Sequence, residues 1–266
     1  MAGVLLFDRP AVRNRSWVAT STLENRVALI TGASGGIGGA LALRLAAEGV
    51  GLALAYGTHA GEAEAVAGRV RELGRRAILL SGDLADPEVP ARLLAETTSG
   101  LGSCDVLVAN AGTGERLPWA DVDLETWDRT VAVNLRAPWL LTQAALPGML
   151  ERGFGRILYV SSIAALNGGV VGPHYAASKA GLHGLMHHIA ARVAGRGVTV
   201  NTIAPALVAG TRMLPADPGN PEAMPMPVPV GRLGTTDEVA DLAATMLRLG
   251  YLTNKTYPLD GGLVPA

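Results

Sequence analysis

Short apolar runs alternate with longer amphipathic segments along most of the chain. The runs are rich in Val, Leu, Ile and Ala, and their length suits buried strands. They predict strands at Val27–Thr31, Gly51–Tyr56, Ala77–Ser81, Val106–Asn110, Arg156–Ser161, Val198–Ile203 and Thr256–Leu259. The segments between them predict helices at about residues 37–48, 61–73, 87–99, 124–151, 175–195 and 236–249.

Strands that alternate with helices are typical of βαβ units, which build parallel sheets. Right-handed crossovers then place helices on both faces of the sheet. The predicted fold class is therefore α/β: a single-domain, Rossmann-like, doubly wound parallel β-sheet of about seven strands.

The chain divides into an extension and one domain. Residues 1–25 lack clean periodicity and predict a flexible N-terminal extension, while residues 26–266 form the predicted domain. Within it, residues 206–232 contain a cluster of prolines, which excludes a helix interior or a central strand there. Two interpretations stay open for this segment: a surface connection, or a substrate loop that acts as a lid.

Composition excludes several classes of function. The 266 residues are 49% apolar and 17% charged, and 22 basic and 23 acidic side chains give a net charge of −1. No large positive field exists to attract nucleic acid. The single cysteine, Cys104, excludes a disulfide framework and a Cys-rich zinc site, so no metal is predicted. No apolar run reaches the roughly 18 residues of a membrane span, so we expect a cytoplasmic protein without a membrane partner.

A glycine-rich turn follows the first predicted strand. Gly32, Gly36 and Gly38 have the spacing G-x-x-x-G-x-G, and a helical pattern begins directly after them. Glycines permit a tight turn and a close approach of the backbone to a pyrophosphate, and the helix N-terminus supplies N–H donors. The turn therefore predicts a dinucleotide site.

The end of the second strand bears on which dinucleotide binds. An acidic residue there would accept a hydrogen bond from a ribose 2′-OH and would repel a 2′-phosphate. The strand ends Tyr56-Gly57-Thr58-His59, and no acid occurs before Glu62. No arginine is present either, and Gly35 stands where a basic residue would help to hold a phosphate. NADP(H) is thus favoured modestly over NAD(H), with Tyr56, Thr58 and His59 as the candidate contacts.

A tyrosine and a lysine lie four positions apart at the start of a helical segment. Tyr175 and Lys179 would share one helix face. An ammonium group beside a phenol favours the phenolate and lowers its pKa. The pair is therefore a candidate proton donor with a lysine that tunes it.

Several ordered motifs together resemble the classical short-chain dehydrogenase/reductase family, from about Arg26 to Leu263. Besides the glycine turn and the Tyr–Lys pair, they are Gly82-Asp83-Leu84, Asn110-Ala111-Gly112, Val133-Asn134-Leu135, Ser161-Ser162 and Asp260-Gly261-Gly262. The chain is most similar to 3-oxoacyl-carrier-protein-reductase-like members. The resemblance implies hydride transfer between a nicotinamide cofactor and a ketone or secondary alcohol, with a 3-oxoacyl thioester as one candidate substrate.

The resemblance also implies roles for four catalytic residues. Ser162 would hold the substrate carbonyl, and Tyr175 would exchange a proton with it. Lys179 would tune Tyr175 and hold the nicotinamide ribose, and Asn134 would bend a helix and hold a proton-relay water. Ser161 would point elsewhere, as a structural residue at a strand end.

Further positions match cofactor contacts of the family. The implied set is Gly32, Ser34, Gly35, Gly36, Ile37, Gly38, Tyr56, Thr58, His59, Asp83, Leu84, Asn110, Ala111, Gly112, Tyr175, Lys179, Pro205, Val208 and Thr211. The chain departs from the family pattern at Ala206, where Gly often follows Pro205, and at Asn254, where many relatives have Gly. The loop before Thr211 is also one residue longer than usual.

Other functions stay open at this point: a non-catalytic dinucleotide sensor on the same fold, and an epimerase or dehydratase. We expect a mainly apolar substrate pocket from Ala164, Leu166, Gly168, His174, Met213 and Leu214. His174 is either a polar contact in that pocket or an ordinary residue of the helix N-terminus.

Two predicted helices carry more apolar residues than one buried stripe needs. They are Trp139, Leu140, Leu141 and Leu146 in the first, and Leu182, Leu185, Met186 and Ile189 in the second. This surplus predicts a homo-oligomer, with a tetramer as the expected state.

Overall fold

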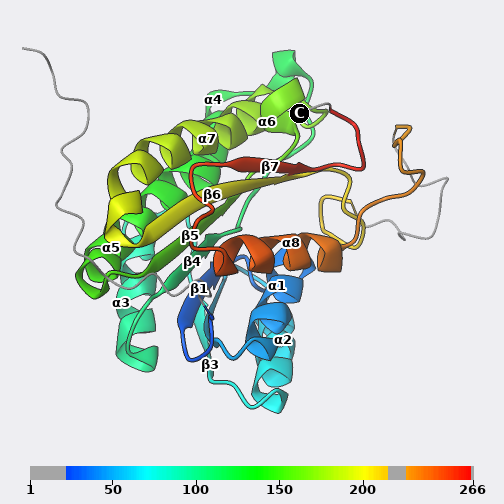
Figure 1. The fold of residues 1–266 in the computed structure, drawn as a ribbon. Coiled ribbons are helices and arrows are strands. Elements are labelled where there is room, and N and C mark those ends of the chain that lie inside the picture. Colours follow the sequence, from blue (N-terminus) through cyan, green and yellow to red (C-terminus); the bar gives the residue numbers. More distant parts are fainter. Residues whose placement is uncertain (1–21, 215–225, 265–266) are drawn as a thin grey trace, which may run out of the picture.

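The computed structural model describes residues 22–214 and 226–264, and it shows one parallel sheet covered on both faces (Figure 1). The strand order is β3-β2-β1-β4-β5-β6-β7. The strands are β1 (Val27–Thr31), β2 (Gly51–Tyr56), β3 (Ala77–Ser81), β4 (Val106–Ala109), β5 (Gly155–Val160), β6 (Val198–Pro205) and β7 (Thr256–Leu259). The predicted doubly wound α/β fold is confirmed.

The helices cover the sheet in two layers. They are α1 (Gly36–Ala47), α2 (Ala60–Glu72), α3 (Val89–Leu101), α4 (Leu124–Val131), α5 (Ala137–Arg152), α6 (Ala164–Asn167), α7 (Pro173–Val193) and α8 (Thr236–Arg248). Helices α1, α2 and α8 lie on one face, and α3, α5 and α7 lie on the other (Figure 1).

The strands are mostly apolar because both faces of the sheet are covered. In β1, Ala28 and Ile30 pack beneath α1 and α8, whereas Val27 and Leu29 pack beneath α3 and α5. Successive residues point to opposite faces, and both faces are covered, so β1, β2 and β4 are apolar at nearly every position.

The predicted helix over residues 124–151 is divided in the structure. Helix α4 ends at Val131, a π-turn (η2) spans Ala132–Arg136, and α5 begins at Ala137. Pro138 has no N–H, so it cannot donate to the carbonyl of Asn134 as an ordinary helix requires. The apolar pattern runs on through this break, which is why periodicity alone predicted one helix.

Part of the predicted organisation lies outside the described residues. Most of the N-terminal extension and residues 215–225 of the proline-rich segment fall there. Within residues 22–214 and 226–264, no helix combines the length and the hydropathy of a membrane span.

Candidate active site

The crevice between β1 and β4 is where the order of the strands reverses. Strands β2 and β3 extend to one side of β1, and β4 to β7 extend to the other. Loops at the carboxyl ends of such neighbouring strands separate and leave room for a ligand. The glycine turn follows β1 and Asn110 follows β4, so both flank this crevice.

Asn110 fastens the two loops together. Its Nδ2 donates to the carbonyls of Thr31 (2.9 Å) and Gly32 (3.1 Å). The buried Thr31 hydroxyl in turn accepts from the N–H groups of Asn110 (3.1 Å) and Ala111 (3.0 Å). Sequence reasoning did not single out Thr31. Its place at the strand end before Gly32 was the available signal.

The glycines of the turn are needed where the backbone approaches itself. A Cβ on Gly38 would lie 2.3 Å from the carbonyl oxygen of Gly32. Gly32 has a φ of +66°, and a Cβ there would lie 2.9 Å from the Cα of Ala111. Any side chain at either position would displace the turn.

The amino end of α1 fits the phosphates of a dinucleotide. Its N-cap, Gly35, has no side chain that could cap the helix, and the first turn holds no acidic residue. The first N–H groups of a helix lack partners within it and favour anions. A cavity of about 330 Å³ opens beside Gly35 and Gly36. Backbone donors, glycines and space therefore coincide at this end of the crevice.

Asn134 is fully buried inside the π-turn. Its Oδ1 accepts from the N–H of Thr113 (2.8 Å), and its Nδ2 donates to the Thr113 carbonyl (2.8 Å) and the Ser178 hydroxyl (3.0 Å). The side chain thus fastens the loop after β4 to α7. The helix leaves regular α geometry at this residue, while the predicted bend itself stays a prediction. Its interaction with a relay water stays a prediction.

Tyr175, Lys179 and Ser162 converge beside this loop. Tyr175 and Lys179 lie in the first two turns of α7, are almost completely buried, and place Nζ 5.8 Å from the centroid of the phenol ring. Lys179 Nζ donates to the Val160 carbonyl (2.8 Å). Ser162 follows β5 and hydrogen-bonds to the Tyr175 side chain. A Cβ on Gly112 would lie 3.0 Å from Lys179 Nζ, so the loop after β4 closes on the lysine.

Burial dominates the titration of both groups. It raises the pKa of Tyr175, against the opposing effect of the Ser162 hydrogen bond. It lowers the pKa of Lys179 to about 8. The net direction follows from the loss of water around the phenol, and the expected lowering by Lys179 stays a prediction. Tyr175 is accordingly held as a neutral phenol at neutral pH.

Ser161 has the structural position that was predicted for it. Its Oγ donates to the carbonyl of Lys179 (2.9 Å) and lies 2.9 Å from Nε2 of His183. These bonds join the end of β5 to the middle of α7. Ser161 thereby supports the turn of helix that carries Lys179.

The residues expected around the adenosine lie along the ends of β2 and β3. Tyr56 is half-buried, and the exposed Thr58 hydroxyl lies 3.0 Å from Nδ1 of its neighbour His59. Asp83 accepts from the N–H of Ala85 (3.0 Å) and forms an ion pair with Arg129 of α4 (3.2 Å), which together lower its pKa. Leu84 beside it is half-buried.

Pro205, Val208 and Thr211 border the glycine turn from the other side. Pro205 ends β6, and the Thr211 hydroxyl donates to the Val208 carbonyl (3.0 Å). A Cβ on Gly36 would lie 3.6 Å from the Thr211 side chain, so this loop faces the turn as expected. Ile37 is half-buried in the first turn of α1.

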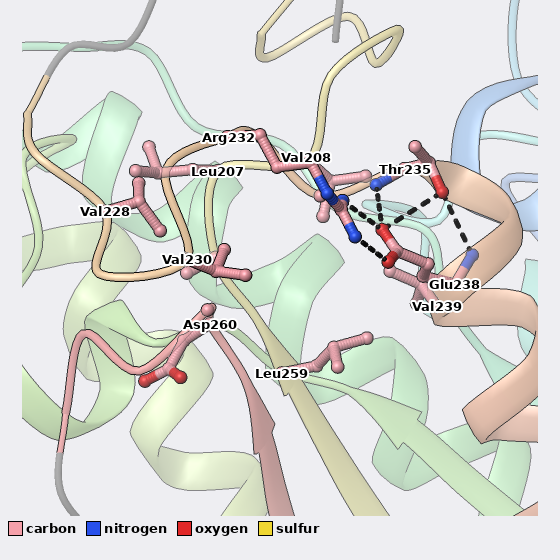
Figure 2. Close-up of a pocket in the computed structure, with 13 residues that line it drawn as sticks. Leu207, Val208, Val228, Val230, Arg232, Thr235, Glu238, Val239, Leu259 and Asp260 are labelled. Atoms are coloured by element: carbon pink, nitrogen blue, oxygen red, sulfur yellow. Dashed lines mark hydrogen bonds and ion pairs between the residues drawn. The ribbon is translucent and has the colours of Figure 1, made fainter.

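A separate small cavity lies behind this loop. It measures about 110 Å³ and is lined by apolar side chains such as Val208, Val228 and Leu259 (Figure 2). An ion pair between Arg232 and Glu238 closes one end of it (Figure 2). None of the four proposed catalytic residues lines this cavity, although Val208, one of the expected cofactor contacts, does.

The residues expected to form the substrate pocket differ in their exposure. Leu166 and Met213 are exposed, Leu214 and Gly168 border them in the loops, and Ala164 is buried. His174 is completely buried, and neither ring nitrogen has a hydrogen-bond partner among the described residues. Its ring packs against Gly172, at the start of its own helix, so it does not contribute to an open surface.

The comparisons with known proteins agree with this geometry. The family model described as short chain dehydrogenase matches residues 26–220. The chain belongs to this family. The intact set of Asn134, Ser162, Tyr175 and Lys179 does not favour the non-catalytic sensor. The protein is an NAD(P)-dependent oxidoreductase acting on CH–OH and C=O groups.

Relatives of this short-chain dehydrogenase cover nearly its whole length. It is 35% identical over 252 residues to L-rhamnose 1-dehydrogenase (NAD(P)(+)) of Sphingomonas sp. (strain SKA58), across 91% of this chain and 97% of the relative. It is also 35% identical over 247 residues to 3-oxoacyl-[acyl-carrier-protein] reductase of Synechocystis sp., across 92% and 99% of the two chains. A solved structure, a blue fluorescent protein from a metagenomic library in complex with NADPH, has a TM-score of 0.84 and 33% identity, over 92% of this chain and 100% of the other.

Proposed function

We propose that the protein is a reductase that takes an apolar ketone, with 3-oxoacyl thioesters among its substrates, and that prefers NADPH. The observation that carries the proposed reaction is the position of Tyr175, which lies beside Ser162 and Lys179 at the crevice. Its phenol is buried, hydrogen-bonded to Ser162 and kept protonated at neutral pH. A protonated phenol is ready to give a proton, which is what an alkoxide oxygen needs as it forms.

The nicotinamide cofactor, when bound, supplies the hydride. The Ser162 hydroxyl holds the carbonyl oxygen of the substrate and orients it toward Tyr175. The Tyr175 Oη then donates its proton to that oxygen. Lys179, fastened to the Val160 carbonyl, places a positive charge near the phenolate that remains. Asn134 keeps the Thr113 loop and α7 at a fixed separation, so the three side chains stay aligned.

A panel of ketones tests this function. Purified protein with NADPH should reduce 3-oxoacyl thioesters and apolar cyclic or aliphatic ketones, and kcat/KM should rise with the apolar area of the substrate. Hydroxylated sugars should be poorer substrates than apolar ketones. A protein that oxidises sugars and leaves every ketone unchanged would contradict the proposed substrate class.

We predict at least a tenfold higher kcat/KM with NADPH than with NADH. No acid stands at the end of β2, and Thr58 and His59 are exposed there and can contact a 2′-phosphate. Gly57→Asp should reverse the preference by repelling that phosphate and accepting from a ribose 2′-OH. A side chain at Gly57 meets nothing within 4 Å, so the substitution should not disturb the fold.

Gly68→Asp is the matched control for the added charge. Gly68 lies on α2 and is equally open, but it is far along the helix from the end of β2. Its variant should keep the preference of the wild type. Equal or better use of NADH by the unmodified protein would refute the assignment of Tyr56, Thr58 and His59.

We also propose a homotetramer, on fewer exposed apolar residues than the sequence predicted. Leu141, Leu182, Met186 and Ile189 belong to the core of one chain, so they are not surplus. Exposed apolar side chains remain before α4 (Trp119), in α4 (Leu124 and Trp127) and in α5 (Trp139). Exposed apolar groups of this size mark association surfaces.

Light scattering on a sizing column should therefore give four times the mass of one chain. Trp139→Glu should shift the population to smaller species, because it places a charge in the surface that we expect to be covered. A monomer at micromolar concentration in the wild type would contradict the tetramer.

Two further proposals concern the loop at residues 206–232 and the cellular compartment of the protein. We propose that residues 206–232 border the substrate, since Thr211 already faces the glycine turn. We propose the cytoplasm as the compartment, where reducing conditions keep a thiol such as Cys104 unpaired.

A further inference from the structure

Arg212 joins three segments that are distant in the sequence. It belongs to the loop after β6, and its Nη2 donates to the Ser34 hydroxyl of the glycine turn (3.3 Å). The same nitrogen donates to the carboxylate of Glu62 in the first turn of α2. The guanidinium therefore lies across the amino end of α1, beside the crevice.

This position lies on the wall of the cavity at the glycine turn. The cavity of about 330 Å³ is lined by Gly35, Gly36, Glu62, Gly210, Thr211 and Arg212. Among these lining residues, Arg212 is the one cation and Glu62 is the one acid. A dinucleotide brings a doubly charged pyrophosphate, and NADPH brings a further 2′-phosphate. The wall that would receive these charges depends on Arg212 for its positive charge.

We propose that Arg212 binds a phosphate of the nucleotide, and that Glu62 holds the guanidinium in place until the nucleotide arrives. This inference rests on the proposed function. The guanidinium presents a planar set of N–H donors that suits phosphate oxygens at least as well as a carboxylate.

The exchange of partners requires little rearrangement. The side chains of Arg212 and Glu62 are 53% and 56% exposed, and ion pairs in water at that exposure are weak. A phosphate on the α1 N-terminus would be held by backbone N–H groups as well as by Arg212. Glu62, at the edge of the same cavity, would then repel the phosphate, so it limits the affinity that Arg212 provides.

Calorimetric titration of the full chain with nucleotides tests the inference without reference to turnover. Arg212→Gln should raise the Kd of NADP⁺ by on the order of tenfold to a hundredfold, the range for a charge-assisted bond to phosphate. Arg212→Lys should retain part of the affinity for NADP⁺, because lysine keeps the positive charge but lacks the planar set of N–H donors. Glu62→Gln should bind NADP⁺ more tightly than the wild type, because it releases Arg212 and removes the repulsion.

Nucleotide fragments distinguish the two phosphates. If Arg212 holds the pyrophosphate, Arg212→Gln should weaken the binding of ADP and NAD⁺ as much as the binding of NADP⁺. If it holds the 2′-phosphate, the variant should weaken the binding of adenosine 2′,5′-bisphosphate and NADP⁺ and leave the Kd of ADP and NAD⁺ unchanged. Both results support a phosphate-binding Arg212 and say which phosphate it meets.

Arg71→Gln is the matched control, because it breaks another exposed Arg–Glu pair, with Glu64 on α2, outside the loop and the glycine turn. It should leave every Kd unchanged. An Arg212→Gln protein that melts like the wild type and binds all nucleotides within twofold of it would overturn the inference. So would a Glu62→Gln protein that loses affinity as Arg212→Gln does, since the pair would then be a structural brace. A wild-type protein that binds neither NADP⁺ nor NAD⁺ would instead refute the proposed function.

Discussion

Tyr175→Phe should lower kcat by about 10²- to 10⁴-fold, the usual contribution of a general acid. The variant lacks the hydroxyl that gives the proton, and it keeps the ring. That ring is 7% exposed and packs against the loop at Gly114, where a Cβ would lie 2.6 Å from it. Packing should therefore be retained, and the Kd of NADP⁺ should stay within about twofold of the wild type.

Tyr159→Phe is the control for the loss of a buried tyrosine hydroxyl. Tyr159 lies on β5 with its hydroxyl 2.7 Å from that of Thr142, and it does not reach the crevice. Its variant should melt at a somewhat lower temperature and should keep its kcat. Residual activity of Tyr175→Phe above about one hundredth of the wild type would refute the assigned proton donor.

Lys179→Met should lose activity and gain stability. The lysine is buried, so the ammonium is poorly solvated, and its pKa falls from 10.5 in the unfolded chain to about 8. Below pH 8 the folded state therefore carries a buried charge. This charge lowers the free energy of unfolding by about 3 kcal/mol. Methionine removes this charge and fills a similar volume. The same change removes the charge beside Tyr175, so kcat should fall by about 10²-fold or more.

The pH dependence distinguishes this effect from simple repacking. As pH rises from 8 toward 10.5, the wild-type lysine becomes neutral in the folded state before it does so in the unfolded state. The advantage of Lys179→Met in melting temperature should therefore be present at pH 7 and should shrink by pH 10. Lys255→Met, at the other and exposed lysine, should change neither melting temperature nor kcat. A Lys179→Met protein that melts lower than the wild type at pH 7 would contradict the unfavourable burial of the charge.

The sequence predicted the fold well because the strands carry an unambiguous signal. In a parallel sheet covered on both faces, residues such as Leu29 and Ile30 are buried on opposite sides, so the run is apolar at most positions. Boundaries shifted by a residue or two, as at β5 and β6. The one larger error, the division of residues 124–151, involves the π-turn before Pro138, whose missing N–H leaves no trace in hydropathy.

Apolar periodicity was a poorer guide to the surface. Leu141 and Met186 were expected to face a second copy, but they lie in the core on the α3, α5 and α7 side of the sheet. These helices pack against one another as well as against the sheet, so each buries more than one stripe. A count of surplus apolar residues on a single helix cannot include those that it buries against neighbouring helices.

The candidate site was predictable where spacing along the chain determines it. Tyr175 and Lys179 are one turn apart on a helix, and the glycines of the turn are adjacent. Arg212 and Glu62 were not predictable in this way, because 150 positions separate them and only the fold brings them together. The upward direction of the Tyr175 pKa was not predictable for a related reason: the loss of solvent around the phenol depends on the fold and cannot be read from the sequence.

Transfer of an isotopic label tests the central claim most directly. The protein should be mixed with a ketone substrate and NADPH that carries deuterium in the transferring position of its nicotinamide ring, and the alcohol should be analysed by mass spectrometry. We predict one deuterium on the carbinol carbon, formed rapidly by the wild type and at least about 10²-fold more slowly by Tyr175→Phe. An alcohol without deuterium, or equal rates for the two proteins, would contradict direct hydride transfer to a carbonyl that Tyr175 protonates.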